Sequence, residues 1–282
     1  MKTQSSTELE SREQDLRARL RSFGSVLLGY SGGVDSAYLA AVALETLGPE
    51  RVLAVTGASA SYPAVQRNVA RDVAVRLGLH HLEIETDELS DPNYTENPTN
   101  RCYFCKSELW SKLAAIAQER RIAVVIDGSN ADDARDHRPG FRAAAEYHVR
   151  SPLLEAGLTK ADIRTLSRAR DLATWDQPSA PCLSSRIPYG LAVTPERLRQ
   201  IERAEAVLRT EGLRVFRVRH HGSSARIEVA GDEMQHALRR ARVLAHELKA
   251  LGFARVLLDI DGYRQGSLNE VQVLPLVQLG AR

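Results

Sequence analysis

A six-residue segment, Ser31-Gly32-Gly33-Val34-Asp35-Ser36, constrains the fold of this chain more than any other feature. It follows the apolar run at 26–30 and precedes a helical pattern at 37–47. A strand, a turn of small residues and a helix direct backbone N–H groups and the positive end of a helix dipole toward an anion. The glycines allow close approach to phosphate, and a carboxylate fits there when a cation lies between them. The segment therefore predicts a phosphate-binding loop.

The spacing excludes two common phosphate-binding loops. A Walker loop needs Gly-Lys-Ser/Thr, and a dinucleotide-binding turn needs Gly-x-Gly-x-x-Gly; neither string is present. The segment instead resembles the PP-loop, the pyrophosphate-binding loop of enzymes that adenylate a substrate with ATP. This resemblance implies that Ser31, Gly32, Gly33 and Ser36 hold pyrophosphate and that Asp35 holds Mg²⁺. An ordinary glycine turn between a strand and a helix is the alternative without a ligand.

The rest of the first 190 residues predicts a parallel sheet with helices on both faces. Apolar runs at 52–55, 82–84 and 122–126 alternate with helical patterns at 63–77 and 105–119, and a further amphipathic helix is predicted at 7–22. In such α/β folds, ligands lie beyond the carboxyl ends of the strands. Ser59 and Gly128 follow two of the predicted strands, so we expect both to contribute to the same ATP site as the loop.

A second, smaller α+β domain is predicted after a loop at 171–193 that is rich in Pro, Ser and Gly. Thr194-Pro195-Glu196 has the residues of a helix start. Strands at 214–219, 225–229 and 254–259 and a helix at 232–250 complete the pattern. We therefore predict an adenylation domain at 1–190 and, at 191–282, a domain that binds substrate phosphate and supports oligomerisation.

Composition excludes several classes of protein. The 282 residues are 43% hydrophobic, but no apolar stretch approaches the roughly 18 residues that cross a bilayer. The first 21 residues lack the apolar core of a signal peptide, so a cytoplasmic location without membrane contact is expected. The net charge of +2 and the small basic excess over 194–250 do not predict a nucleic-acid partner.

Three cysteines suggest thiol or metal chemistry. Cys102 and Cys105 form a Cys-x-x-Cys motif, and Cys182 lies in the loop between the predicted domains. The sequence leaves four interpretations open: a redox dithiol, a zinc site completed by His137 or His148, a three-cysteine iron–sulfur site, and ordinary buried thiols.

Strings along nearly the whole chain, taken together, resemble the LarE family. These enzymes are ATP-dependent sulfur transferases that insert sulfur into a pyridinium mononucleotide on the way to the nickel-pincer cofactor. The matching strings are the loop at 31–36, Asn100-Arg101-Cys102-Tyr103-Phe104-Cys105-Lys106, Asp127-Gly128, Arg138-Pro139-Gly140, the segment 182–190, Arg217-Val218-Arg219 and Ala225-Arg226-Ile227-Glu228.

The resemblance implies the reaction and its sulfur source. ATP would adenylate a carboxylate of pyridinium-3,5-biscarboxylic acid mononucleotide, and sulfur would replace AMP to give a thiocarboxylate. Family members either sacrifice the sulfur of one cysteine or carry sulfide on a [4Fe-4S] cluster held by three cysteines. Because Cys102, Cys105 and Cys182 are all present, we expect the cluster type; the alternative is sacrifice of Cys182.

The resemblance also assigns residues in the second half of the chain. Arg217 and Arg219 alternate on a predicted strand, so both point to one face, where paired guanidiniums bind phosphate well. In the family this position receives the substrate's phosphate. Ser185 and Arg186 would orient substrate beside the sulfur donor. Glu205 and Glu228 match acidic positions that would hold a second cation, and a homo-oligomer is expected.

Three rival functions remain open at this point. A PP-loop tRNA thiolase would also use cysteines, but it predicts a larger basic surface. An amide-forming PP-loop ligase would use ammonia and has no role for the cysteines. A nucleotide-sensing module would leave Arg186 and Cys182 without a function.

Overall fold

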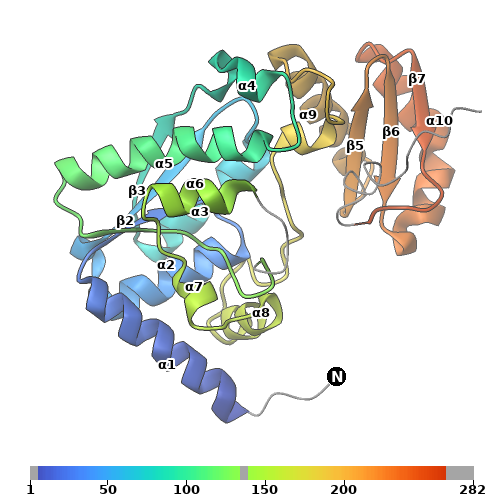
Figure 1. Ribbon diagram of the computed structural model, residues 1–282. Helices are drawn as coiled ribbons and strands as arrows, with labels where there is room; N and C mark the ends of the chain where they lie inside the picture. Colours follow the sequence, from blue (N-terminus) through green and yellow to red (C-terminus); the bar gives the residue numbers. More distant parts are fainter. Residues whose placement is uncertain (1–5, 134–138, 265–282) are drawn as a thin grey trace, which may run out of the picture. The chain divides into compact units, whose positions relative to one another are not determined.

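The structure, a computed structural model, describes residues 6–133 and 139–264. The chain divides into two compact units, residues 1–182 and 183–282 (Figure 1). Residues 183–190, which the sequence assigned to the first domain, belong to the second unit. In the described ranges no helix is both long and apolar enough to cross a membrane.

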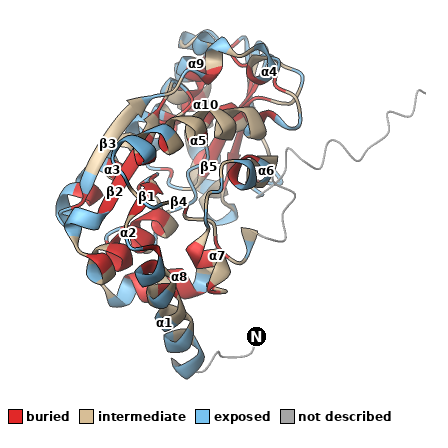
Figure 2. Cartoon of the chain, turned by 60° about the vertical axis from the view of Figure 1, so that its left-hand side comes forward, coloured by how far each residue is buried: buried red, intermediate tan, exposed pale blue. Residues whose placement is uncertain are grey.

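The first unit is built on a four-stranded parallel sheet, which confirms the predicted α/β class. Its strands are β1 (Val26–Gly29), β2 (Val52–Ala58), β3 (His80–Glu85) and β4 (Val124–Ile126), in the order β3-β2-β1-β4. β1 and β2 are almost fully buried, whereas the edge strand β3 is mostly half-buried (Figure 2). Because β2 and β4 flank β1 on opposite sides, the loops after β1 and β4 border the point where ligands bind in such sheets.

Helices cover both faces of this sheet. The helices are α1 (Ser6–Phe23), α2 (Val34–Leu47), α3 (Ala64–Leu77), α4 (Pro92–Thr95), α5 (Arg101–Glu119), α6 (Pro139–Glu146), α7 (Pro152–Glu155) and α8 (Lys160–Ala169), with short 3₁₀ turns η1 (Pro49–Arg51) and η2 (Glu88–Ser90). Alternation along β1 sends Val26 and Leu28 into one core and Leu27 into the other.

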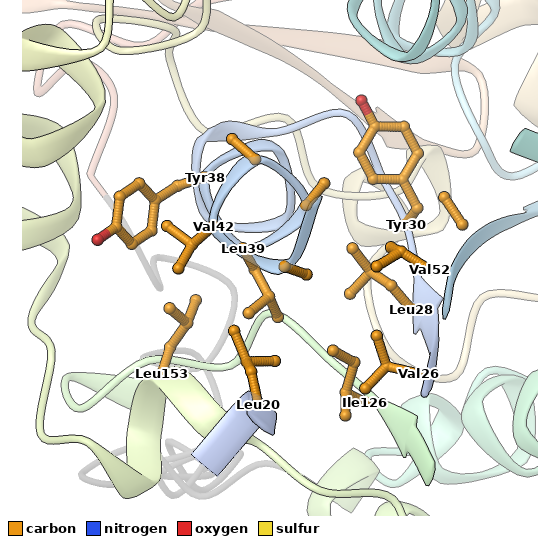
Figure 3. Close-up of a cluster of buried hydrophobic side chains, with 14 of the residues drawn as sticks. Leu20, Val26, Leu28, Tyr30, Tyr38, Leu39, Val42, Val52, Ile126 and Leu153 are labelled. Carbon is orange, nitrogen blue, oxygen red and sulfur yellow. The ribbon is translucent and has the colours of Figure 1, made fainter. Parts of the chain in front are cut away.

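The larger core joins α2 to the sheet and to the helices around it. Leu39 of α2 lies among Val26 and Leu28 of β1, Leu20 of α1 and Leu153 of α7 (Figure 3). All five side chains are fully buried or nearly so. Burial of each such side chain contributes about 1.5–3 kcal/mol, so this core fixes the start of α2 relative to β1. The opposite core packs α5 and α6 against the sheet.

The second unit has the predicted α+β composition and its own core. It contains η4 (Leu183–Arg186), α9 (Pro195–Thr210), β5 (Phe216–His221), β6 (Ser224–Val229), η5 (Gly231–Glu233), α10 (Met234–Ala250) and β7 (Arg255–Leu258). β5 and β6 pair antiparallel, and β7 joins β6 in parallel. Thr194 accepts a hydrogen bond from the backbone N–H of Arg197, as expected for the cap of α9.

The structure corrects one local expectation and adds a helix that was not predicted. α5 begins at Arg101 and not at 105, because the backbone N–H of Arg101 already bonds Pro98 and that of Tyr103 bonds Asn100. Cys102 and Cys105 therefore lie in the first turns of a helix. The sequence interpretation also did not single out α8, although Thr159 and Asp162 form the capping box that begins it.

Gly29 is required by the core, which gives a test of the fold. A Cβ on Gly29 would lie 2.7 Å from Cζ3 and 2.9 Å from Cη2 of the buried Trp110 ring. We expect Gly29→Ala to reduce the free energy of unfolding by about 1–3 kcal/mol, the usual cost of overpacking. Urea unfolding followed by far-UV circular dichroism measures the loss.

Trp110→Phe supplies the control, because phenylalanine lacks the ring atoms that meet the new methyl group. Gly29→Ala should cost less in the Trp110→Phe background than in the natural protein, which is a favourable coupling in a double-mutant cycle. If Gly29→Ala reduces the free energy of unfolding equally in both backgrounds, the Trp110 ring is not what excludes a side chain at position 29.

Candidate active site

The loop at 31–36 is ordered by its own hydroxyl groups. The Oγ atoms of Ser31 and Ser36 are 3.1 Å apart, and Ser36 Oγ donates to the Gly33 carbonyl at 3.2 Å. The Ser31 N–H donates to Ser36 Oγ at 3.3 Å. Ser36 is buried and Ser31 is exposed. Ser31 is therefore accessible to solvent, whereas the hydrogen bonds of the buried Ser36 stabilise the conformation of the loop.

The N-terminus of α2 is open to a ligand. Gly33 is the N-cap residue, and as a glycine it makes no side-chain capping bond to the first N–H groups of the helix. Those N–H groups have no partner within a helix, and they lie at the positive end of its dipole. An anion placed there would satisfy them, so the local geometry fits the predicted pyrophosphate site.

Gly32 has a packing role that the sequence did not reveal. Its φ is +63°, and a Cβ would lie 2.4 Å from Cα of Ala70 on α3. Only glycine adopts this conformation without strain, and only glycine leaves room for the backbone of α3. The loop is therefore pressed against α3.

Asp35 is the charged member of the loop. Its Oδ2 pairs with Lys160 Nζ at 2.5 Å, and its buried Oδ1 has no hydrogen-bond partner among the described residues. Burial raises the pKa of the Asp35 carboxyl, while the positive charges of Lys160 and Arg164 lower it. A hard cation such as Mg²⁺ prefers an oxygen ligand of this kind. Oδ1 therefore fits the predicted Mg²⁺ position.

The segment after β4 lies against the start of α2. A Cβ on Gly128 would be 3.2 Å from the backbone nitrogen of Ser36, so a side chain would crowd the loop. The neighbouring Asp127 is buried and accepts hydrogen bonds from the backbone and hydroxyl of Ser129 and from the hydroxyl of Ser151. The structure thus brings Gly128 to the loop, as expected, and Asp127 holds the turn.

Ser59, predicted at the ATP site, begins a chain of hydrogen bonds after β2. Its Oγ is 2.8 Å from Ser61 Oγ, which in turn donates to the buried carboxylate of Glu88 at 2.8 Å. The charge of Glu88 is close enough to raise the pKa of Cys105. A polar connection therefore runs from the end of β2 toward the cysteines, and the ATP role of Ser59 stays a prediction.

The three cysteines gather within the first unit. Cys102 and Cys105 occupy the first turns of α5, and Cys182 is the last residue of the unit. Burial raises the pKa of Cys105, and Glu88 and then Cys182 raise it further. The pKa of Cys102 is also raised, first by desolvation and next by Cys182, although this residue keeps exposed surface. The charge of Cys182 therefore raises the pKa of both Cys102 and Cys105.

The structure bears on two of the four interpretations of the cysteines, the redox dithiol and the zinc site. A redox dithiol needs a thiol of lowered pKa, and neither thiol of the Cys-x-x-Cys motif has one. Among the described residues, no three His, Cys, Asp or Glu side chains are grouped for a single metal ion, and His137 lies outside them. The iron–sulfur interpretation, which needs all three cysteines as ligands, stays a prediction.

The second unit contains a buried cluster of charged residues. Arg186 forms two hydrogen bonds with Glu205, of 2.8 and 3.2 Å, and Arg219 bonds Glu228 at 2.9 Å. Arg217, two residues from Arg219 on β5, donates to the Phe216 carbonyl and lies over the ring of Tyr263. All three guanidiniums and both carboxylates are at least nine-tenths buried.

The electrostatics of the cluster favour an anion. Burial lowers the pKa of Arg217, and the nearby charge of Arg186 lowers it further. Among the described residues, Arg186, Arg217 and Arg219 lie together with Glu205 and Glu228, and guanidiniums bind phosphate well through charge-assisted hydrogen bonds. Ser185 is part of the same group, because its carbonyl accepts from Arg219 and its hydroxyl from Arg186.

Both carboxylates of the cluster are already engaged. Glu205 also accepts from the Val218 N–H, and Glu228 accepts from Arg226 at 2.8 Å. No third acidic or histidine side chain joins them in the described residues to form a metal site. Their assignment to a second cation stays a prediction, and their evident role is to hold the arginines.

Sequence reasoning did not identify several groups that hold the loop. Lys160 is one, and the others bond to the Ser31 carbonyl: Tyr62 Oη at 2.9 Å and Gln66 Nε2 at 3.0 Å. The capping box at the start of α8 was a visible signal for the position of Lys160. No local pattern marks a tyrosine or a glutamine as a partner of a distant carbonyl.

Comparison with known proteins agrees with this architecture. A family profile described as NAD synthase matches residues 9–132, which include the loop and the strands β1 to β4. Together the parallel sheet, the loop after β1 and this match define a PP-loop ATP pyrophosphatase domain.

Full-length relatives narrow the class further. An uncharacterised protein of Synechocystis is 42% identical over 265 residues, which cover 93% of this chain and 98% of that protein. The pyridinium-3,5-bisthiocarboxylic acid mononucleotide synthase of Lactiplantibacillus plantarum is 34% identical over 262 residues, 93% of this chain and 95% of the synthase. An uncharacterised protein of Methanocaldococcus jannaschii is 26% identical over 239 residues, 85% of this chain and 90% of its own. The chain belongs to the family of that synthase, the LarE-like PP-loop enzymes.

The ion pair between Lys160 and Asp35 leads to a prediction for the pH dependence of ATP binding. Its charge lowers the pKa of the Asp35 carboxyl, so Lys160→Met should raise that pKa, and Asp35 should then be protonated at a higher pH. Since the neutral acid is a poor Mg²⁺ ligand, affinity for Mg²⁺·ATP should fall at a higher pH in the variant than in the natural protein. Calorimetric titrations between about pH 5 and 8 measure the midpoint of this loss.

Lys160→Arg is the matched control, because it keeps the positive charge beside Asp35. Its midpoint should stay near that of the natural protein. An unchanged midpoint in Lys160→Met would show that the ion pair does not control the carboxylate.

Proposed function

We propose that this protein is an ATP-dependent sulfur transferase that converts a carboxylate of pyridinium-3,5-biscarboxylic acid mononucleotide into a thiocarboxylate. The observation that carries the proposal is the presence of an open PP-loop and three neighbouring thiols in one unit. Membership in the family of the Lactiplantibacillus synthase supports the choice of substrate.

Adenylation is the first step. A substrate carboxylate oxygen attacks the α-phosphorus of ATP, and the bond to the β-phosphate oxygen breaks to release pyrophosphate. The N–H groups at the start of α2 and the hydroxyl of Ser31 would bind the leaving pyrophosphate. Mg²⁺ held by Asp35 would offset negative charge on the phosphates.

Sulfur transfer is the second step. A sulfur nucleophile attacks the carbonyl carbon of the acyl adenylate, the bond to AMP breaks, and a thiocarboxylate remains. Cys102, Cys105 and Cys182 would hold a [4Fe-4S] cluster that supplies the transferable sulfide. The alternative is a sacrificial reaction in which the C–S bond of Cys182 breaks and dehydroalanine is left in the chain.

The arginine cluster of the second unit would bind the substrate's phosphate. Arg217 and Arg219 provide the donors, while Glu205 and Glu228 hold Arg186 and Arg219 in place. A buried guanidinium cluster suits a phosphate monoester better than an uncharged group. The burial of these guanidiniums favours a small phosphorylated substrate over tRNA.

An amide-forming ligase is the second candidate, favoured by the NAD synthase profile over 9–132. Both reactions begin with adenylation and differ in the nucleophile that displaces AMP.

Protein purified without oxygen, given ATP and the pyridinium dicarboxylate, should yield AMP, pyrophosphate and a product heavier by the exchange of oxygen for sulfur. A product that instead contains nitrogen when ammonia is supplied would overturn the sulfur-transfer proposal.

Substitution of the cysteines should distinguish the adenylation step from the sulfur-transfer step. Cys182→Ser should keep ATP–pyrophosphate exchange, because the thiol does not take part in adenylation, and it should abolish thiocarboxylate formation. Cys102→Ser with Cys105→Ser should have the same effect if a cluster carries the sulfur. Mössbauer spectra of the natural protein and intact mass after turnover provide the measurements.

Two results would overturn the cluster mechanism. The first is sulfur transfer that survives the double substitution at Cys102 and Cys105. The second is a colourless protein whose Cys182 loses its sulfur in one turnover, which would establish the sacrificial mechanism instead.

Arg217 gives a test of substrate binding. Arg217→Gln should raise KM for the mononucleotide by on the order of tenfold or more, since a charge-assisted hydrogen bond contributes about 1.5–3 kcal/mol. The KM of the corresponding nucleoside, which lacks the phosphate, should change little. Arg209→Gln, on the exposed surface of α9, is the control, and its KM for both compounds should match the natural protein. Equal effects of Arg217→Gln on both substrates would contradict a phosphate contact.

A further inference from the structure

A hydrogen-bonded connection joins the PP-loop to the segment that leads to Cys182. Gln66 on α3 donates from Nε2 to the Ser31 carbonyl at 3.0 Å. Its Oε1 accepts from Gln177 Nε2 at 3.1 Å. Gln177 lies 111 residues away from Gln66 in the sequence and five positions before Cys182. One amide group thus contacts the adenylation loop on one side and the cysteine-bearing segment on the other.

The amide of Gln66 is buried, with 5% of the residue exposed. A buried amide costs free energy unless its donor and acceptor are both satisfied. Here the donor is used by Ser31 and the acceptor by Gln177. The two contacts use different atoms of Gln66, so the contact with Ser31 does not require the contact with Gln177.

A second anchor holds the same segment from α8. Arg164 donates from Nη1 to the carbonyl of Trp175 and from Nη2 to the carbonyl of Gln177, each at 2.8 Å. Lys160, one turn earlier on the same helix, holds Asp35 of the loop. Residues four apart lie on one face of a helix. α8 therefore contacts both the loop and the segment through one face.

The distance along the chain makes these anchors relevant to Cys182. Cys182 comes five positions after Gln177, so the cysteine lies within about 18 Å of the anchored residue even in an extended chain. A shift of the anchor moves the cysteine, and misplacement of a reacting group by about 1 Å can cost on the order of 100-fold in rate.

We infer that Gln66, Gln177 and Arg164 are positioning residues that tie Cys182 to the PP-loop, so that ATP bound at the loop and the reactivity of Cys182 depend on each other. The inference rests on the proposed function for its catalytic meaning. The mechanical connection itself is independent of which nucleophile displaces AMP.

Gln177→Leu breaks the contact with Gln66 and leaves the loop's own bonds in place. We expect ATP–pyrophosphate exchange to stay within about twofold of the natural protein, while sulfur transfer per adenylate falls about tenfold or more. Arg164→Lys, which retains the charge but not the fork that binds two carbonyls, should show the same split. Gln118→Leu makes the same exchange of side chain on the exposed surface of α5 and should change neither rate.

A labelling experiment tests the connection without catalysis. Iodoacetamide modification of each cysteine is followed by peptide mass spectrometry, with and without Mg²⁺·ATP and in the absence of any carboxylate substrate. ATP should change the labelling rate of Cys182 by severalfold in the natural protein and in Gln118→Leu, and this change should be absent in Gln177→Leu.

The outcomes separate the inference from the proposed function. Equal loss of exchange and transfer in Gln177→Leu, or a response of Cys182 to ATP that survives the substitution, would overturn the inference. If the natural protein adenylates no pyridinium carboxylate, the proposed function fails, and the labelling response alone still decides whether the connection exists.

Discussion

The uncapped start of α2 is the constraint on which the site depends. A helix that begins within a domain leaves its first N–H groups without partners, and most proteins satisfy them with a side chain. Here Gly33 offers no side chain, while the helix behind it is fixed by the core around Leu39. The packing free energy of α2 thus holds the N–H groups in place for an anion. Ser36, Gly128 and the close contact of Gly32 with Ala70 all serve this arrangement.

The two units differ in how their charged side chains are paired and buried. In the first unit, Lys160 partly offsets the charge of Asp35, while the other carboxylate oxygen of Asp35 has no hydrogen-bond partner within the described ranges. In the second unit, guanidiniums and carboxylates are buried together, which is costly unless each is paired. Arg186 with Glu205 and Arg219 with Glu228 meet that condition. Such buried pairs contribute little net stability, because the cost of removing each charge from water offsets their attraction.

The sequence predicted what local patterns determine. Alternating apolar runs gave the parallel sheet, and the string at 31–36 gave the loop and its place after β1. The start of α5 was set four residues too late, because backbone bonds at Pro98 and Asn100 begin the helix before its apolar pattern does. Lys160 as the partner of Asp35, 125 residues away, could not be predicted, since pairing at that separation depends on the completed fold. The same holds for Gln66 and Gln177.

The raised pKa values of Cys102 and Cys105 have a consequence for handling the protein in air. Oxidation proceeds through the thiolate, and burial together with neighbouring negative charge keeps both side chains in the thiol form at neutral pH. The metal-free chain should thus resist sulfenic acid and disulfide formation, although Cys102 is accessible to solvent. The environment that disfavours the thiolate therefore slows the oxidation of Cys102 and Cys105.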